Sequence, residues 1–138
     1  MTLSQKSLVR QTFAAVVPIA DQAAAMFYGR LFELNPSLRS LFMIDIREQG
    51  KKLMQMIGFC VGKLDALDEL VPIVKSLGAR HVGYGVVEAD YAAVGAALLW
   101  TLEQGLGPAF TPEVKDAWAT VYDVLSRTMI AGAETATA

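Results

Sequence analysis

The chain has 138 residues, a length that fits one compact domain with a core large enough to be stable without disulfides. Its 12 basic and 14 acidic side chains are mixed along the sequence, so we expect no binding of nucleic acid or of an anionic membrane surface. It has one cysteine, Cys60, and one histidine, His81. These counts exclude an internal disulfide, a His/Cys zinc cluster and a pair of histidines acting together.

The apolar run at residues 13–20 is the one segment that resembles an export signal. It is short, contains Pro18 and is closed by Asp21, whereas a secretory signal has a longer uninterrupted apolar stretch. One unpaired thiol also fits a reducing compartment. We therefore expect a cytoplasmic protein.

Proline, glycine and capping residues divide the chain into segments whose apolar residues repeat every three or four positions. No segment alternates as a half-buried strand does, so the sequence predicts an all-α fold. Ser4 and Asp21 are the expected N-caps of the first two helices, and Pro36 is expected in the first turn of the third. In chain order, the predicted helices span about residues 4–17, 21–34, 36–42, 47–64, 69–81, 90–106 and 111–130, followed by a frayed tail over 131–138.

Three polar side chains lie on apolar helix faces. Tyr28 shares a face with the apolar residues of the second helix, and Gln49 lies four residues before Leu53 on the inward face of the fourth. His81 continues the apolar stripe of the next helix, one turn beyond Leu77. We expect all three polar groups to point inward.

Each of these residues also has an ordinary structural explanation. A tyrosine on a core face is commonly an apolar body whose hydroxyl reaches the surface, and a glutamine near a helix start is commonly solvated or capping. A lone histidine on an apolar face is commonly a packed core side chain. Against this, burying polar groups without partners costs about a few kcal/mol each. An apolar pocket with a few convergent polar groups is the usual form of a small-molecule or cofactor site.

One imidazole, one phenol and one amide limit the chemistry that such a site can perform. They cannot supply the three protein ligands of a catalytic zinc, and no motif around Cys60 marks it as a nucleophile. They can serve a cofactor that brings most of its own ligands. Haem is such a cofactor, because its ring supplies four nitrogens to the iron and the protein adds an axial ligand, here His81.

Several motifs along the chain are weak singly and specific in their order and spacing. They are Phe27, Tyr28, Leu31 and Phe32; Asn35, Pro36, Leu38, Leu41 and Phe42; residues 51–54; residues 77–86 around His81; Tyr91, Val94 and Gly95; and Ala117, Trp118, Val121 and Tyr122. In this order the chain resembles the single-domain bacterial globins. It is similar to the haem domains of flavohaemoglobins and to thermostable bacterial globins with a Tyr and Gln distal pair, over about residues 4–129.

The resemblance implies a single globin domain over residues 1–138 that binds haem b, iron protoporphyrin IX. It implies that His81 is the proximal iron ligand and that Tyr28, Gln49 and Leu53 line the distal pocket. The further residues that it places at the haem are Phe42 at the helix corner, Lys52 beside a propionate, Val86 and Val94 on the ring, and Tyr91 on the proximal side.

The function that follows is reversible binding of O2 with high affinity, with Tyr28 donating a hydrogen bond to the bound O2 and Gln49 assisting or tuning it. Nitric oxide, carbon monoxide, cyanide and sulfide are further small ligands that such a pocket accepts. No partner subunit is implied, and we expect a monomer or a weak dimer.

Two alternatives remain open. The first is a nitric oxide dioxygenase that depends on an external reductase, because 138 residues leave no room for a reductase domain. In flavohaemoglobin-like domains a glutamate on the last helix polarises the proximal histidine, and the matching position here is Met129, which disfavours efficient turnover. The second is a haem-free sensor or interaction module in which His81 is only packed.

Overall fold

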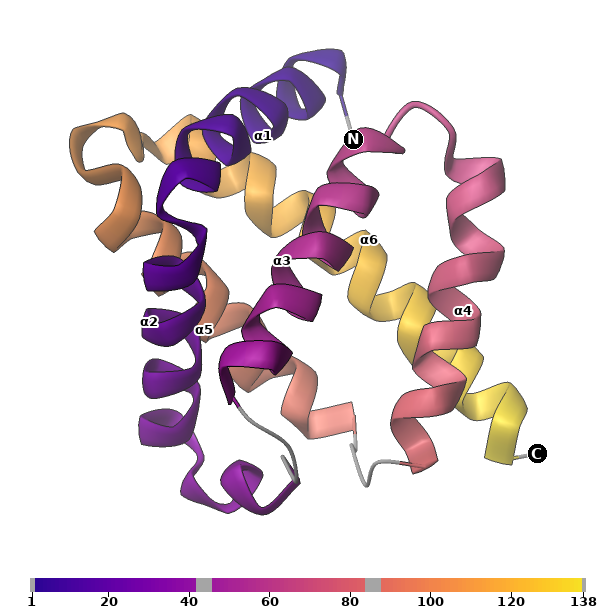
Figure 1. The fold of residues 1–138 in the computed structure, drawn as a ribbon. Coiled ribbons are helices and arrows are strands. Elements are labelled where there is room, and N and C mark those ends of the chain that lie inside the picture. Colours follow the sequence, from indigo (N-terminus) through magenta and orange to yellow (C-terminus); the bar gives the residue numbers. More distant parts are fainter. Residues whose placement is uncertain (1, 42–45, 84–87, 138) are drawn as a thin grey trace.

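A computed structural model describes residues 2–41, 46–83 and 88–137, and within these ranges the regular structure is entirely helical (Figure 1). The all-α prediction is therefore confirmed. The elements in chain order are α1 (Leu3–Val16), η1 (Val17–Ile19), α2 (Ala20–Leu34), η2 (Pro36–Leu41), α3 (Ile46–Gly62), α4 (Leu67–Gly83), α5 (Glu88–Leu106), η3 (Gly107–Ala109) and α6 (Pro112–Thr137), where η denotes a 3-10 helix.

The first helix begins earlier than its predicted cap. Thr2, not Ser4, is the N-cap of α1: its hydroxyl accepts the Gln5 backbone N–H at 3.0 Å, and the Gln5 side-chain oxygen accepts the Thr2 backbone N–H at 2.9 Å. This reciprocal pair satisfies two otherwise unpaired donors. Ser4 has no glutamate or glutamine three residues later and lies inside the helix.

Two other helix ends also differ from the prediction. Asp21 does not cap α2, because η1 leads directly into the helix at Ala20 and leaves Asp21 in its first turn, where a carboxylate favours the helix dipole. The last helix does not fray at Ile130 but continues to Thr137. Alanine has the highest helix propensity, and Gly132 packs against the backbone of α4, so both local and tertiary effects extend α6.

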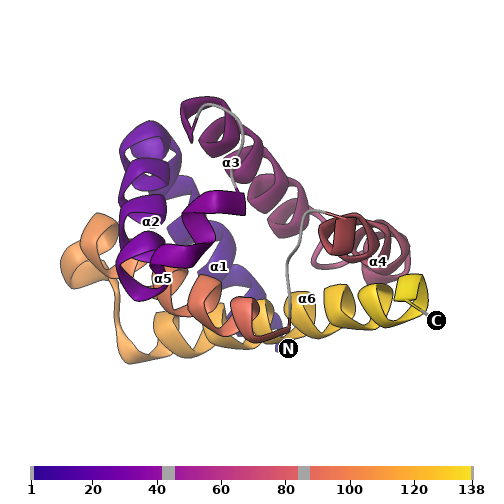
Figure 2. The same cartoon turned by 90° about the horizontal axis from the view of Figure 1, so that it is seen from below.

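The helices bury three apolar clusters. The largest lies where α1, α3, α5 and α6 meet and includes Trp118, whose indole N–H donates to the hydroxyl of Thr12 at 2.8 Å. A second cluster joins α2 to α5, and a third joins α3 to α4 and α6. Viewed from below, α4 lies along α6 at one end of the molecule and α2 lies at the other, with α3 between them (Figure 2).

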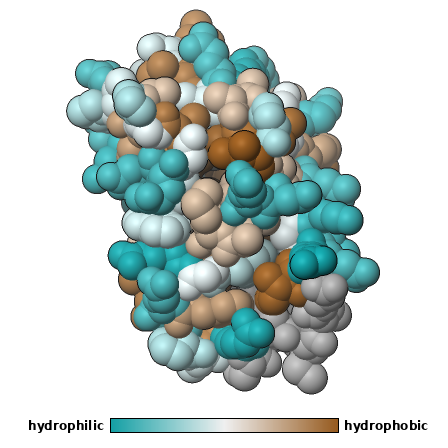
Figure 3. Space-filling model, turned by 60° about the vertical axis from the view of Figure 1, so that its left-hand side comes forward, coloured by the Kyte–Doolittle hydropathy of each residue, from teal (hydrophilic) through white to brown (hydrophobic). Residues whose placement is uncertain are grey.

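The face shown in Figure 3 mixes polar and apolar residues. The large apolar side chains that are exposed are scattered over the helices: Leu3, Val17, Leu34, Phe59 and Ile73. Within the described ranges, no helix has the length and apolar content needed to cross a membrane.

The bond between Trp118 and Thr12 generates a stability prediction. Thr12→Val should lower the free energy of unfolding by about 1 to 3 kcal/mol in urea denaturation, because the buried indole N–H loses its acceptor. Thr128→Val is the matched control, since the Thr128 hydroxyl donates to the Val124 carbonyl of its own helix. Equal losses in the two variants would contradict this role of Thr12.

Candidate functional site

The orientation of His81 is set by its own helix. The side chain lies in the last turn of α4, half-buried, with Nδ1 at 2.7 Å from the carbonyl oxygen of Leu77. Because a carbonyl oxygen only accepts, Nδ1 carries the proton in this bond, and the neutral ring has its lone pair on Nε2. Neutral imidazole with an oriented second nitrogen is the form in which histidine binds metals.

Tyr28 lies on α2 in strongly apolar surroundings. Its side chain is 3% exposed, with the Phe27 ring edge-on at a centroid distance of 5.0 Å and the Phe32 ring stacked at 6.0 Å. Burial raises the pKa of Tyr28 to about 12, against a smaller lowering by a hydrogen bond with the Gln49 side chain. The phenol therefore stays protonated across the physiological range.

The Gln49 side chain on α3 forms a hydrogen bond with the Tyr28 phenol on α2. Tyr28 and Gln49, predicted to share a pocket, are in contact across α2 and α3.

Leu53 and Lys52 are neighbours on α3, but Leu53 lies against the core and Lys52 lies in solvent. Leu53 is half-buried, lies one helical turn after Gln49 and packs against the second apolar cluster. Lys52 is exposed beside it and forms no ion pair with any residue in the described part of the chain. The Lys52 ammonium group is therefore in contact with solvent, where it can meet an anion.

Val94 and Tyr91 lie on α5. Val94 packs against the second apolar cluster, to which Tyr28 belongs. Tyr91 is buried; desolvation, and then the charge of Asp90, raise the pKa of its phenol, and its carbonyl accepts the Tyr122 hydroxyl at 2.5 Å. Phe42 and Val86, the other two predicted haem contacts, lie outside the described residues.

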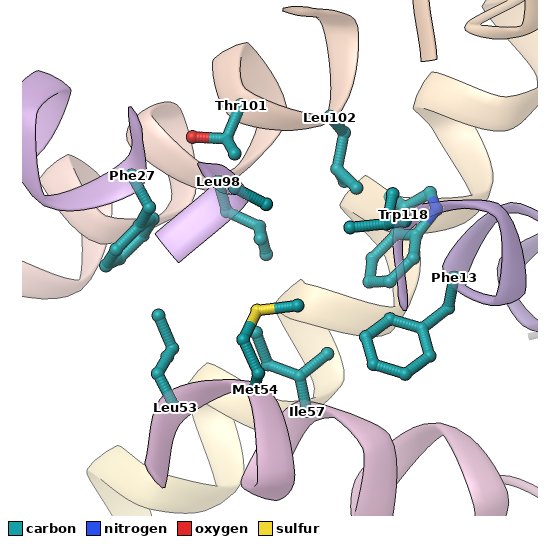
Figure 4. A pocket seen from close by; sticks show the side chains of 11 residues that line it. Phe13, Phe27, Leu53, Met54, Ile57, Leu98, Thr101, Leu102 and Trp118 are labelled. Atoms are coloured by element: carbon teal, nitrogen blue, oxygen red, sulfur yellow. The ribbon is translucent and has the colours of Figure 1, made fainter. Parts of the chain in front are cut away.

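A small apolar cavity lies beside Phe27 and Leu53 (Figure 4). Side chains of five helices line it, including Phe13 and Trp118, and its one hydroxyl, that of Thr101, donates to the Ala97 carbonyl at 2.8 Å. The centre of a water-sized sphere can move over about 20 Å³, which is room for roughly one water-sized molecule. The cavity can hold a diatomic gas and not an organic substrate.

Two residues of the site were not predicted from the sequence. Leu77 was recognised only as part of the apolar stripe, although its position four residues before His81 is the spacing at which a helical side chain reaches a backbone carbonyl. Tyr122 appeared only as a motif residue. Its bond to the Tyr91 carbonyl joins residues far apart in the sequence, and no local pattern indicates it.

Comparison with protein families matches the globin family over residues 25–129. The chain belongs to the globin family. It is similar to a neuroglobin of Danio rerio, with 30% identity in an alignment of 141 positions that covers 92% of this chain and 89% of that protein. It is also similar to a flavohemoprotein of Bordetella parapertussis, with 31% identity over 128 residues, 91% of this chain and 32% of that protein. This globin thus spans about a third of the flavohemoprotein, and the resemblance to flavohaemoglobin haem domains is confirmed.

The site residues of this globin fit a haem cofactor, which family membership also supports. Haem needs a nitrogen donor for its iron, and the imidazole of His81, oriented through Nδ1 by the Leu77 carbonyl, can supply Nε2. It also needs apolar walls, which the cluster around Tyr28 and Val94 supplies. The described residues contain no group of three or more acidic, histidine or cysteine side chains that could hold a metal ion by themselves.

The raised pKa of Tyr28 makes stability depend on alkaline pH. The folded chain holds the phenol proton more tightly than the unfolded chain, so the free energy of unfolding should fall as pH rises from about 10 to about 12. One such group contributes at most about 1.4 kcal/mol per pH unit. Tyr28→Phe should reduce this slope in urea denaturation, while Tyr122, whose pKa burial also raises, keeps part of it. An unchanged slope would contradict the burial of a protonated Tyr28.

Proposed function

We propose that this chain is a haem b globin that binds O2 reversibly, with His81 as the proximal ligand and Tyr28 as the distal hydrogen-bond donor. The observation that carries the proposal is the bond between His81 Nδ1 and the Leu77 carbonyl, which orients the imidazole on α4 so that Nε2 is the nitrogen that would bind iron. When bound, haem supplies an iron with one position for a small gaseous ligand.

The other contacts follow from where the side chains lie. His81 Nε2 is the axial donor, and the exposed Lys52 pairs with a propionate at the rim. Val94 packs on the ring from α5. Phe42 and Val86, which lie outside the described residues, are further ring contacts that the resemblance implies. Tyr91 forms part of the proximal wall. These side chains bind and orient the cofactor and exclude water from it.

On the distal side, Tyr28 discriminates between ligands by charge. An O2 ligand held by haem would carry partial negative charge and would accept a hydrogen bond from the Tyr28 phenol, whereas a carbon monoxide ligand would carry little charge. Gln49, through its hydrogen bond with Tyr28, orients the phenol toward the ligand. Nitric oxide, cyanide and sulfide can occupy the same position. The neighbouring cavity supports a ligand of two or three atoms, because its volume suits a molecule of that size.

The proposed setting is a single domain over residues 1–138, a monomer or weak dimer in the cytoplasm, kept ferrous by an external reductase. Similarity to a flavohemoprotein supports an electron-delivering partner. The paired Tyr28 and Gln49 also suit a second function, nitric oxide dioxygenase, in which nitric oxide, O2 and one electron from the reductase give nitrate. Met129 packs beside the apolar cluster of Cys60, Leu70 and Val74 and offers no carboxylate, which favours ligand binding over turnover.

The donor role of Tyr28 predicts a selective change in kinetics. Tyr28→Phe should speed O2 dissociation about ten- to a hundredfold in stopped-flow measurements, because one buried hydrogen bond of about 1 to 3 kcal/mol is lost. Carbon monoxide dissociation from the same variant is the internal control and should change by less than about threefold. Equal changes for both gases, or no change for O2, would show that Tyr28 is not the donor.

Mixing the oxygenated protein with nitric oxide separates the two functions. A binder should convert about one equivalent of nitric oxide and stop, with the iron left ferric. A dioxygenase should continue to consume nitric oxide when a reductase and its reductant are added. Sustained nitrate production at a rate that follows the reductase concentration would favour the enzyme over the O2 binder.

A further inference from the structure

Two glycines lie where α4 and α6 cross and approach each other closely. A Cβ atom on Gly78 of α4 would collide with the carbonyl group of Met129 on α6, and a Cβ atom on Gly132 of α6 would collide with the carbonyl group of Lys75 on α4. The two contacts are reciprocal and three residues apart on each helix. They run along the side where Figures 1 and 2 show α4 beside the C-terminal half of α6.

Such an approach is possible only without side chains at both positions. The contacts bring backbone to backbone, where glycine Cα–H groups can meet carbonyl oxygens. An alanine at either position would have to displace a helix, because the atoms it meets belong to backbone and not to the far end of a flexible side chain. The pair therefore fixes how deeply α4 sits on α6.

The glycine contact is linked directly to the imidazole of His81. The carbonyl that accepts the Nδ1–H of His81 belongs to the peptide unit joining Leu77 to Gly78. The same Gly78 is in backbone contact with Met129. A shift of this peptide unit must move the acceptor of the imidazole bond, and with it the direction of Nε2.

We propose that Gly78 and Gly132 are positioning residues that hold α4 against α6 and thereby set where His81 presents its Nε2. Earlier on α4, Leu70 and Val74 pack with Cys60 and so anchor the start of the helix. The glycine pair holds its second half, which carries His81. The consequence for the haem ligand rests on the proposed function, whereas the helix contact itself does not.

The experiment compares Gly78→Ala and Gly132→Ala with a matched control, Gly29→Ala. Gly29 also lies within a helix, is exposed, and has nothing within 4 Å of an added Cβ, so alanine there should be neutral or stabilising. Helix propensity alone predicts the same for all three variants. Only a role in helix contact predicts that alanine at residues 78 and 132 destabilises the protein.

In the haem-free protein, we expect the backbone amides of residues 75–81 to exchange about ten- to a hundredfold faster in the two test variants than in the wild type. Exchange in α2 should change less. The control variant should show no such change in residues 75–81. In the ferrous haem protein, the iron–histidine stretching band in resonance Raman spectra should be shifted or broadened in the test variants alone. A purely structural role would lower the midpoint of unfolding and leave this band in place.

The outcomes separate the two proposals. A wild-type chain that takes up no haem would overturn the proposed function, while exchange in α4 would still decide whether the glycines hold it. Exchange equal to that of the control, or faster exchange with an unmoved band, would overturn the positioning role. If Gly78→Ala does not fold, Gly132→Ala still provides the test, because its methyl group is added on α6 and not on α4, the helix that carries His81. If neither variant folded, the contact would hold the whole core and not α4, and the inference would be wrong.

Discussion

The hydrogen bond from His81 Nδ1 to the Leu77 carbonyl is the interaction on which the site depends. It decides which ring nitrogen carries the proton, and so which one can bind a metal. The bond exists only while α4 remains helical through His81, because the acceptor lies one turn earlier on the same helix. The chemistry of the only histidine therefore follows from the placement of one helix, and that placement follows from how α4 packs on α6.

The other side of the site balances burial against hydrogen bonding. Burying the Tyr28 phenol disfavours its ionised form and keeps it a hydrogen-bond donor, while Gln49 gives the phenol oxygen a partner. The apolar residues around this pair serve two purposes: they strengthen its polar contacts by excluding water, and they form walls for a flat hydrophobic cofactor. Figure 2 shows α4, the helix of His81, and α2, the helix of Tyr28, on either side of α3.

Much of the fold was predictable from the sequence, because helical periodicity and breaker residues are local signals. The same periodicity correctly predicted that Tyr28 points inward and that Gln49 and Leu53 share a face of α3. The errors have two different causes. α6 continues to Thr137 through a region where Gly132 meets α4, a contact that no local pattern indicates. α1 starts at the capping box of Thr2 and Gln5, which is a local signal that the choice of Ser4 as the cap overlooked. The roles of Phe42 and Val86 remain predictions from resemblance.

Titration of the haem-free protein with haemin tests the central claim most directly, since His81 is the only imidazole in the chain. The wild-type chain should bind one equivalent and give a ferrous spectrum typical of histidine-ligated haem. His81→Ala should lose that spectrum and regain it when free imidazole is added, because the pocket walls remain while the donor is supplied from solution. A His81→Ala variant whose ferrous spectrum matches the wild type without imidazole would contradict the assignment of His81 as the iron ligand.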